Sequence, residues 1–246
     1  MPLRPYYGPH AGITIYHGDC REILPQLPKV DLVLTDPPYE FEAHTLQRRV
    51  QHGKDAAADY GRSVVFEALP FGPMTETLRL ESAILLAGLV NGWALTFCQV
   101  EGAPMWRAAF EAAGMNYRRT CIWVKPDGMP QYSGDRPGMG YETFIAMHSP
   151  GKSEWNGGGK HGVFIHNKAI SALPNEHPTQ KPIPLMKELV RLFSDENDTV
   201  LDAFMGSGST LIASKDLNRR AIGIEIEERY CEIAAKRLSQ EVLCFD

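Results

Sequence analysis

The segment "VDLVLTDPPY" places a carboxylate, two prolines and an aromatic ring directly behind an apolar run that is typical of a buried strand. Pro37 and Pro38 have a fixed φ and no N–H, so this turn is stiff and its carbonyl groups point in defined directions. Asp36 and the Pro37 carbonyl supply two acceptors, and Tyr39 supplies a flat face. An exocyclic amine on a base offers two N–H donors and a ring that stacks on aromatic side chains. The segment therefore predicts four catalytic residues for chemistry on such an amine: Asp36, Pro37, Pro38 and Tyr39.

A second candidate site is the sequence "TVLDAFMGSGSTLIASKDL", whose pattern predicts a strand, a glycine turn and a helix. Gly206 and Gly208 would let a ligand approach the backbone closely, and Ser209 and Thr210 are suited to cap the helix. A glycine pair alone indicates a structural turn equally well. The support comes from Glu225, which ends a short predicted strand, because an acid there can accept hydrogen bonds from both hydroxyls of a ribose.

The neighbours of the glycine turn distinguish between ribose-containing ligands. A dinucleotide fingerprint requires Gly or Ala where this chain has Leu211. Asp202, just before the turn, would repel a pyrophosphate and would suit an ammonium group. S-adenosylmethionine carries ribose, adenine and an amino-acid head but no phosphate, so the site chemistry favours it over NAD.

Three motifs together resemble those of a known family. "TDPPY" and "DAFMGSGST" are similar to motifs IV and I of the amino-directed (N6-adenine and N4-cytosine) DNA methyltransferases, and "HPTQKP" is similar to their motif X. The catalytic motif precedes the cofactor turn, as in the circularly permuted β group of that family. "YRRTCIWVKP" and "GDRPGMGYETFIAMH" resemble family segments at lower specificity.

The resemblance implies S-adenosyl-L-methionine as the cofactor. The permuted order would place the strand "GITIYHGD" beside "AIGIEIE", so that Asp19 falls where the motif III acid meets the cofactor adenine. Lys181 would lie beside the cofactor carboxylate, although a solvated lysine preceding a helix is the alternative. The implied cofactor-binding residues are Asp19, Asp36, His177, Thr179, Lys181, Asp202, Phe204, Gly206, Ser207, Gly208, Ser209, Thr210 and Glu225.

The resemblance also implies direct in-line methyl transfer to a base flipped out of DNA, without a covalent adduct. No Pro-Cys dipeptide of the kind used by carbon-5 cytosine enzymes is present. The aspartate of "DPPY" favours adenine N6, because the family's cytosine N4 enzymes more often begin this motif with serine. An N4-cytosine enzyme, an RNA or protein amine methyltransferase, a catalytically silent binding subunit and an NAD oxidoreductase are the alternatives.

Binding of DNA needs local positive charge, since the formal net charge of the chain is −5. Ordinary solvated surface is the competing interpretation of each basic cluster. The predicted substrate-binding residues are Arg48, Arg49, Lys54, Trp123 and Lys125, with further basic candidates at Arg118, Arg119, Lys152, Lys160 and Lys168.

These residues must be positioned by an α/β fold, because short β-branched runs alternate with helical patterns along the chain. We expect a Rossmann-like, mainly parallel seven-stranded sheet with helices on both faces, in one domain spanning residues 1–246. Two insertions interrupt it: residues 40–75, a substrate loop, and residues 126–176, a short target-recognition region. So short a region suggests a homodimer or a short DNA target.

The remaining composition indicates a cytoplasmic protein. No apolar segment reaches the roughly 20 residues of a membrane span, and there is no apolar signal sequence. The five cysteines are scattered, so we expect free thiols and no metal site.

Overall fold

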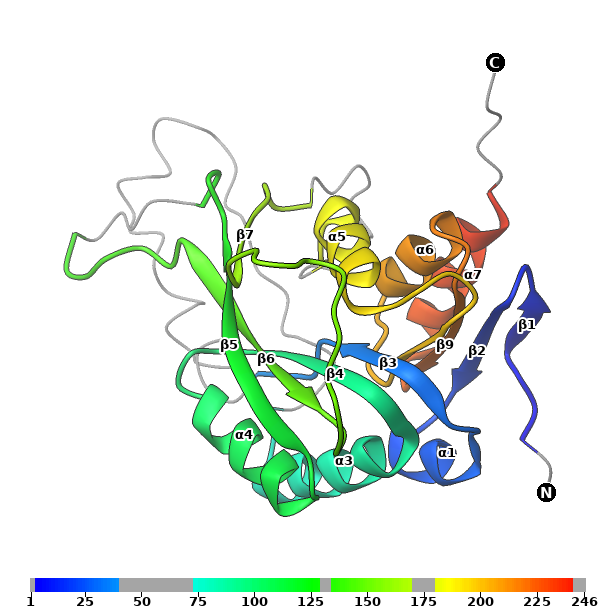
Figure 1. Cartoon of the computed structure of the whole chain (residues 1–246). Helices are drawn as coiled ribbons and strands as arrows, with labels where there is room; N and C mark the ends of the chain where they lie inside the picture. The colour runs from blue at the N-terminus through cyan, green and yellow to red at the C-terminus, as the bar shows by residue number, and fades with distance from the viewer. Residues whose placement is uncertain (1–2, 40–72, 129–133, 170–179, 241–246) are drawn as a thin grey trace, which may run out of the picture.

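The computed structural model describes residues 3–39, 73–128, 134–169 and 180–240, in which nine strands form a sheet in the order β1-β2-β9-β8-β3-β4-β6-β5-β7 (Figure 1). The strands are β1 (Tyr7–His10), β2 (Ile13–His17), β3 (Val30–Thr35), β4 (Val90–Cys98), β5 (Asn116–Val124), β6 (Tyr141–His148), β7 (Val163–Ile165), β8 (Thr199–Asp202) and β9 (Arg220–Glu225). The helices are α1 (Cys20–Ile23), the 3-10 helix η1 (Leu24–Gln26), α3 (Glu76–Leu89), α4 (Ala103–Ala112), α5 (Ile183–Phe193), α6 (Ser209–Asp216) and α7 (Glu228–Ser239).

Most of the sheet is parallel, which confirms the predicted fold class. Parallel pairing joins β2 to β9, β9 to β8, β8 to β3 and β3 to β4. Strand β6 is antiparallel to both of its neighbours, β4 and β5. The predicted contact between the first strand of the resemblance and the strand ending at Glu225 is also confirmed, because Ile13 pairs with Ala221 and His17 with Glu225.

The prediction of seven strands was too low by two edge strands. Strand β1 adds to β2 in an antiparallel direction, and β7 adds to β5 in a parallel direction. Neither strand has a long apolar run, since β1 contains Gly8 and Pro9 and the apolar sequence of β7 is only three residues long. Both strands form because an open sheet edge offers unpaired N–H and C=O groups. The second insertion, residues 126–176, therefore contains two strands, β6 and β7, whereas residues 40–72 of the first lie outside the described residues.

Helices cover both faces of the sheet, and an apolar core lies on each face between the helices and the sheet (Figure 1). Helices α5, α6 and α7 pack on one face with Leu32 and Leu34 of β3. Helices α1, α3 and α4 pack on the other face with Val30 and Val33. Successive residues of a strand point to opposite faces, so a strand buried on both sides has a continuous apolar run in its sequence. Among the described helices, none combines the length and apolarity needed to cross a bilayer.

The parallel strands bring their carboxyl ends to one edge of the sheet, where open α/β sheets bind ligands. Asp36 directly follows β3, while Asp202 and Glu225 end β8 and β9, and Asp19 follows β2 by two residues. Strand β6 runs in the opposite direction, so its beginning, near Glu142, lies at this same edge.

Candidate active site

The Asp36 carboxylate has two oxygens in different surroundings. Oδ2 accepts a hydrogen bond from the ammonium group of Lys181. Oδ1 is buried and has no hydrogen-bond partner among the residues that the structure describes. Burial raises the pKa of Asp36 above its ordinary value, and the Lys181 charge opposes that rise. One oxygen of Asp36 is thus held by a cation, and the other is left as an acceptor.

A buried ionic cluster surrounds this carboxylate. The Lys181 Nζ lies 3.2 Å from Glu142 Oε2 and 3.3 Å from the Tyr39 hydroxyl. The Tyr39 hydroxyl donates to Glu142 Oε2 at 2.8 Å, and Lys125 Nζ donates to Glu142 Oε1 at 2.5 Å. Burial alone would raise the pKa of Glu142, but the charges of Lys181 and Lys125 outweigh it and bring the pKa to about 2. Two carboxylates and two ammonium groups therefore balance each other beside the "DPPY" turn.

Lys181 lies between two carboxylates, a position that was not predicted from the sequence. Its side chain is 6% exposed and its ammonium group contacts Asp36 and Glu142, which excludes the solvated lysine that was the alternative. Contact with a cofactor carboxylate stays a prediction. The two other motif X residues, His177 and Thr179, lie outside the described residues.

Two predicted DNA contacts are also inside the molecule. Trp123 is 2% exposed, and its indole N–H donates to the His166 carbonyl at 2.8 Å. Lys125 is engaged with Glu142, and its Nζ lies 4.7 Å from the centre of the Trp123 ring. Trp123 lies in β5 and Lys125 directly follows that strand, and both side chains are largely enclosed by the protein. Contact of these two residues with DNA stays a prediction. The predicted contacts Arg48, Arg49 and Lys54 fall within residues 40–72 and are not described.

The glycine turn adopts a backbone that glycine favours. Gly206 has a φ of +50° and Gly208 a φ of +83°. The Gly206 N–H donates to Glu225 Oε2 at 2.9 Å. Gly208 is the N-cap of α6 and no side chain caps this helix, so the prediction that Ser209 and Thr210 cap it was wrong. Both residues instead begin the helix, and the left-handed glycine makes the change of direction.

Leu211 occupies the position where a dinucleotide site has a small residue, and the strand supplies the small residue instead. Leu211 is fully buried. A Cβ added at Gly223 of β9 would lie 2.8 Å from a δ carbon of Leu211 and 2.4 Å from Met205 Sδ. The close approach of α6 to the sheet therefore depends on Gly223.

Asp202 links the glycine turn to the catalytic strand. It is 2% exposed, and its oxygens accept hydrogen bonds from Thr35 Oγ1 at 2.8 Å and Thr210 Oγ1 at 2.5 Å. The Phe204 N–H donates to the same carboxylate at 3.1 Å. Burial raises the pKa of Asp202 to about 6, against these three hydrogen bonds. Both oxygens hold the turn in place, and direct contact with an ammonium group stays a prediction.

Glu225 is held in the same way at the neighbouring strand end. Its Oε1 accepts from the Glu227 N–H and its Oε2 from the Gly206 N–H, both at 2.9 Å. Burial raises the pKa of Glu225. Each carboxylate oxygen can accept two hydrogen bonds, so acceptor capacity for ribose hydroxyls remains.

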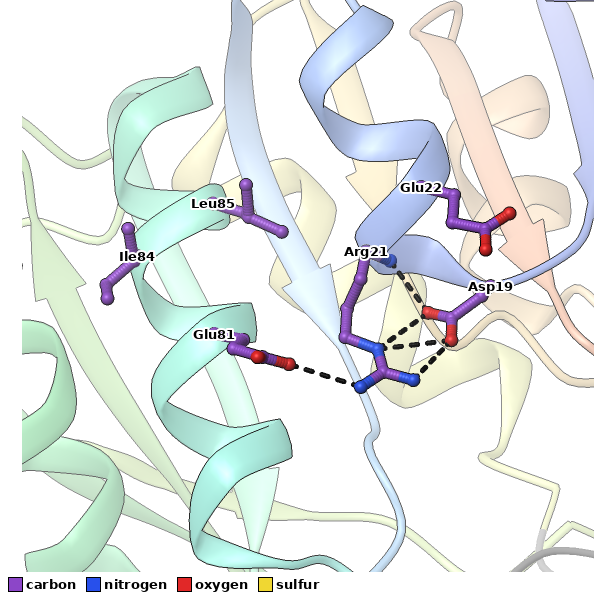
Figure 2. A pocket seen from close by; sticks show the side chains of 6 residues that line it. All are labelled: Asp19, Arg21, Glu22, Glu81, Ile84 and Leu85. Carbon is purple, nitrogen blue, oxygen red and sulfur yellow. Dashed lines mark hydrogen bonds and ion pairs between the residues drawn. The ribbon is translucent and has the colours of Figure 1, made fainter.

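Asp19 lines a hollow of about 440 Å³ with Arg21, Glu22, Glu81, Ile84 and Leu85 (Figure 2). Its carboxylate caps α1 by accepting from the Arg21 N–H at 2.8 Å, and it also pairs with the Arg21 guanidinium. These hydrogen bonds lower the pKa of Asp19. Arg21 in turn reaches Glu81 of α3 at 3.1 Å, so it bridges the two walls of the hollow in Figure 2.

Comparison with known proteins decides the family. The DNA methylase family of N6 and N4 enzymes matches residues 30–236. The chain belongs to this family of amino-directed DNA methyltransferases. The methylase is 25% identical over 271 residues to the type II methyltransferase M2.DpnII of Streptococcus pneumoniae, covering 98% of this chain and 94% of that one. It is also 25% identical over 249 residues to M.HinfI of Haemophilus influenzae, covering 92% and 68%.

Solved structures resemble the methylase over nearly its whole length. The M1.HpyAVI complex with SAM is 30% identical with a TM-score of 0.71, covering 93% of this chain and 100% of that one. The cytosine-N4-specific PvuII DNA methyltransferase has a TM-score of 0.72 at 16% identity, covering 98% and 91%. The second likeness shows the fold alone.

The methylase brings most of its predicted residues to one edge of the sheet, and sequence reasoning missed one member. Asp36, Tyr39 and Lys181 meet in the ionic cluster, and the glycine turn meets Glu225. Glu142 was not predicted, although it lies in a segment that resembles the family at lower specificity. No group of three or more His, Cys, Asp or Glu side chains that could hold a metal occurs in the described ranges.

The site residues suit a polar cofactor. Asp36 Oδ1 and Ser209 Oγ are both buried without a hydrogen-bond partner in the described part of the chain. An unsatisfied buried polar atom costs about 1–3 kcal/mol, so a bound ligand with matching groups recovers that cost. Asp36 directly follows β3, and Ser209 begins α6 directly after the glycine turn.

Proposed function

We propose that this methylase transfers a methyl group from S-adenosylmethionine to the N6 amine of an adenine flipped out of DNA. The observation that carries the proposal is the Asp36 carboxylate: Lys181 fixes one oxygen, and the other is buried with no hydrogen-bond partner in the described ranges. It follows strand β3 in a stiff turn, beside the glycine turn of α6.

The residues of the turn activate the amine. Its lone pair is delocalised into the ring, which makes it a poor nucleophile. Asp36 Oδ1 and the Pro37 carbonyl accept its two N–H bonds, which favours sp³ geometry and frees the lone pair. Tyr39 stacks on the base, a contact worth about 1–3 kcal/mol. S-adenosylmethionine supplies the electrophilic methyl group when bound. Asp36 Oδ1 also takes the proton that the amine loses.

The cysteines support transfer without a covalent adduct. Four described cysteines are buried. Burial raises the pKa of Cys20 and Cys121 to about 11 and that of Cys231 to about 12, so these thiols stay protonated. A protonated, buried thiol is a poor nucleophile.

The cofactor site is formed by the elements at the carboxyl edge. Gly206, Ser207, Gly208 and Ser209 offer backbone and hydroxyl groups, and Glu225 accepts from the ribose. Further contacts come from Asp19, Phe204, Thr210, Lys181 and the undescribed His177 and Thr179, and Asp202 acts by fixing the turn.

Adenine is the proposed base because "DPPY" begins with aspartate, and N4-cytosine is the alternative. The named relatives M2.DpnII and M.HinfI are type II methyltransferases, which supports a role in restriction and modification. We further propose that residues 1–246 form one domain and that the protein is cytoplasmic. Because the target-recognition region is short, we also propose that a homodimer could recognise the DNA sequence.

The test is nucleoside mass spectrometry of unmethylated DNA incubated with the protein and S-adenosylmethionine. We expect N6-methyladenine with the wild type and none with Asp36→Ala. Asp216→Ala, which removes an exposed carboxylate paired with Lys187, is the control and should keep activity. Detection of N4-methylcytosine would support the same mechanism and would change the assigned target base from adenine to cytosine. No methylated nucleoside, with cofactor binding demonstrated and varied DNA supplied, would overturn the proposal in favour of RNA, protein or a silent subunit.

A further inference from the structure

We propose that Glu142 is a positioning residue for methyl transfer: its carboxylate fixes the Tyr39 ring and holds Lys181 against Asp36 Oδ2, which leaves Oδ1 as the acceptor for the target amine. This inference rests on the proposed function, and it assigns to β6 a part in the reaction beside that of the "DPPY" turn.

The position of Glu142 follows from the direction of its strand. Glu142 is the second residue of β6 and pairs with Trp123 of β5. Because β6 is antiparallel to β4, its first residues lie at the carboxyl edge of the parallel strands. From there the side chain reaches over β4 to the turn that follows β3, and Lys181 Nζ lies 4.9 Å from the ring centre of Phe97 in β4.

Each oxygen of Glu142 has a defined partner. Oε1 accepts from Lys125, and Oε2 accepts from the Tyr39 hydroxyl and lies 3.2 Å from Lys181. Burial and the neighbouring carboxylates raise the pKa of Tyr39 well above its usual value, so its hydroxyl stays protonated and donates. The hydroxyl therefore fixes the rotation of the ring that stacks on the base.

The charges explain why a carboxylate is needed at this position. Burial opposes the charge of Lys181, but Asp36 and Glu142 outweigh it and raise the pKa of the ammonium group. Without Glu142, Lys181 would have Asp36 as its one carboxylate partner in the cluster, and Lys125 would have none. A bound methylsulfonium would then meet an excess of positive charge, and Asp36 would be held as a simple ion pair.

The test compares Glu142→Gln with the wild type in methylation, cofactor binding and pH dependence. Gln keeps the size and one acceptor but removes the charge. We expect kcat to fall about tenfold or more, the range of a lost transition-state interaction, while the Kd for S-adenosylmethionine changes less than about threefold.

The pH profile separates positioning from a structural role. The titratable groups around Asp36 are Lys181, Tyr39 and Glu142, and its charge also interacts with that of Asp202. These groups together determine the pKa of Asp36. Glu142 raises the pKa of Asp36, and its loss should move the acidic limb of kcat to lower pH. Glu142→Asp keeps the charge and shortens the reach, so it should lower kcat without moving the limb.

A double-mutant cycle tests the link to the ring. Tyr39→Phe removes the hydroxyl that donates to Glu142, and the double variant with Glu142→Gln should lose less than the product of the two single losses. Glu111→Gln, which removes an exposed charge paired with Arg107 on α4, is the matched control and should behave as the wild type.

The outcomes distinguish the two proposals. A folded Glu142→Gln protein with wild-type kcat and an unmoved acidic limb overturns this inference and leaves the proposed function intact. If Glu142→Gln does not fold, Glu142→Asp decides, and wild-type kcat in that variant overturns the inference. A wild-type protein that methylates no DNA overturns both.

Discussion

At the residue scale, the two oxygens of Asp36 differ because of a lysine that lies 145 positions away in the chain. The pairing fixes the carboxylate, since a buried charge is stable only when it is paired or hydrogen-bonded. The other oxygen, which has no partner among the residues described, is held in a defined direction, whereas the carboxylate of a fully solvated aspartate would rotate. Activity therefore depends on the protonation state of a carboxylate whose neighbours set its pKa.

Lys181→Gln should move the acidic limb of the methylation rate to higher pH. The Lys181 charge lowers the pKa of Asp36, so removing it lets the pKa rise further, and Asp36 becomes protonated at a higher pH. Protonated Asp36 cannot accept from the amine in the same way, so the rate falls earlier on acidification. The measurement is kcat against pH for the variant and the wild type. Movement to lower pH, or none, would contradict this account of Asp36.

At the scale of elements, the site is formed where strand ends meet. Thr35 of β3 and Thr210 of α6 both donate to Asp202 at the end of β8. The catalytic turn and the cofactor turn are thus joined through one buried carboxylate. Backbone hydrogen bonds within the sheet alone would not fix these loops relative to each other.

Asp202→Asn should become more stable relative to the wild type as the pH rises. The pKa of Asp202 is raised from 3.8 to about 6 in the folded protein, so its ionised form is disfavoured there. Below pH 4, protonated Asp202 makes its whole contribution to the free energy of unfolding. That contribution falls by about 3 kcal/mol in total as the pH rises through about 6. Asn does not titrate. Urea unfolding of both proteins from pH 4.5 to 8 measures the difference, and a difference independent of pH would refute the prediction.

Gly208→Ala should lower both stability and affinity for S-adenosylmethionine. A left-handed backbone costs a non-glycine residue about 1–2 kcal/mol, and a Cβ here would lie 2.9 Å from the Ala234 Cβ of α7. Gly114→Ala is the matched control, because Gly114 has a φ of +88° but nothing within 4 Å of its added Cβ. The control should show the backbone cost alone, with unchanged affinity by calorimetry. Equal affinity in both variants would mean that the glycine turn does not contact the cofactor.

At the scale of the whole molecule, the negative net charge requires DNA binding to be local. The formal charge is −5, while each base pair of DNA presents two phosphates. Lys125 and Lys181, two cations of the site, are already paired with carboxylates. Phosphate contacts therefore fall to other basic residues, among which we propose those of the first insertion.

Replacing Arg48, Arg49 and Lys54 together with Ala should weaken DNA binding and reduce its dependence on salt. Each lost phosphate contact lowers the slope of log K against log salt concentration by about 0.9, so three contacts lower it by about 2.7. Fluorescence anisotropy with labelled DNA over a range of salt concentrations measures the slope. Arg107→Ala, whose guanidinium pairs with Glu111, should leave it unchanged. An unaltered slope in the triple variant would exclude these residues as phosphate contacts.

The sequence by itself determined the fold class and the main site segments, because both depend on local patterns. Continuous apolar runs indicate strands buried on both faces, and the stiffness of Pro37 and Pro38 and the left-handed turn at Gly208 are properties of residue type. The same logic failed where a pattern was weak, as in the edge strands β1 and β7, whose pairing depends on a free sheet edge rather than on their own residues.

Only the tertiary structure decided which charges meet. Lys125 and Trp123 were predicted to contact DNA, and the structure adds a contact that was not predicted: Lys125, which directly follows β5, pairs with Glu142 of the neighbouring strand β6. Glu142 is the second residue of an antiparallel strand, and no local signal shows that its side chain reaches over β4 to the turn after β3. Electrostatic energy depends on distance in space and on burial, neither of which is encoded by spacing along the chain. The cluster around Asp36 therefore follows from the order and direction of the strands.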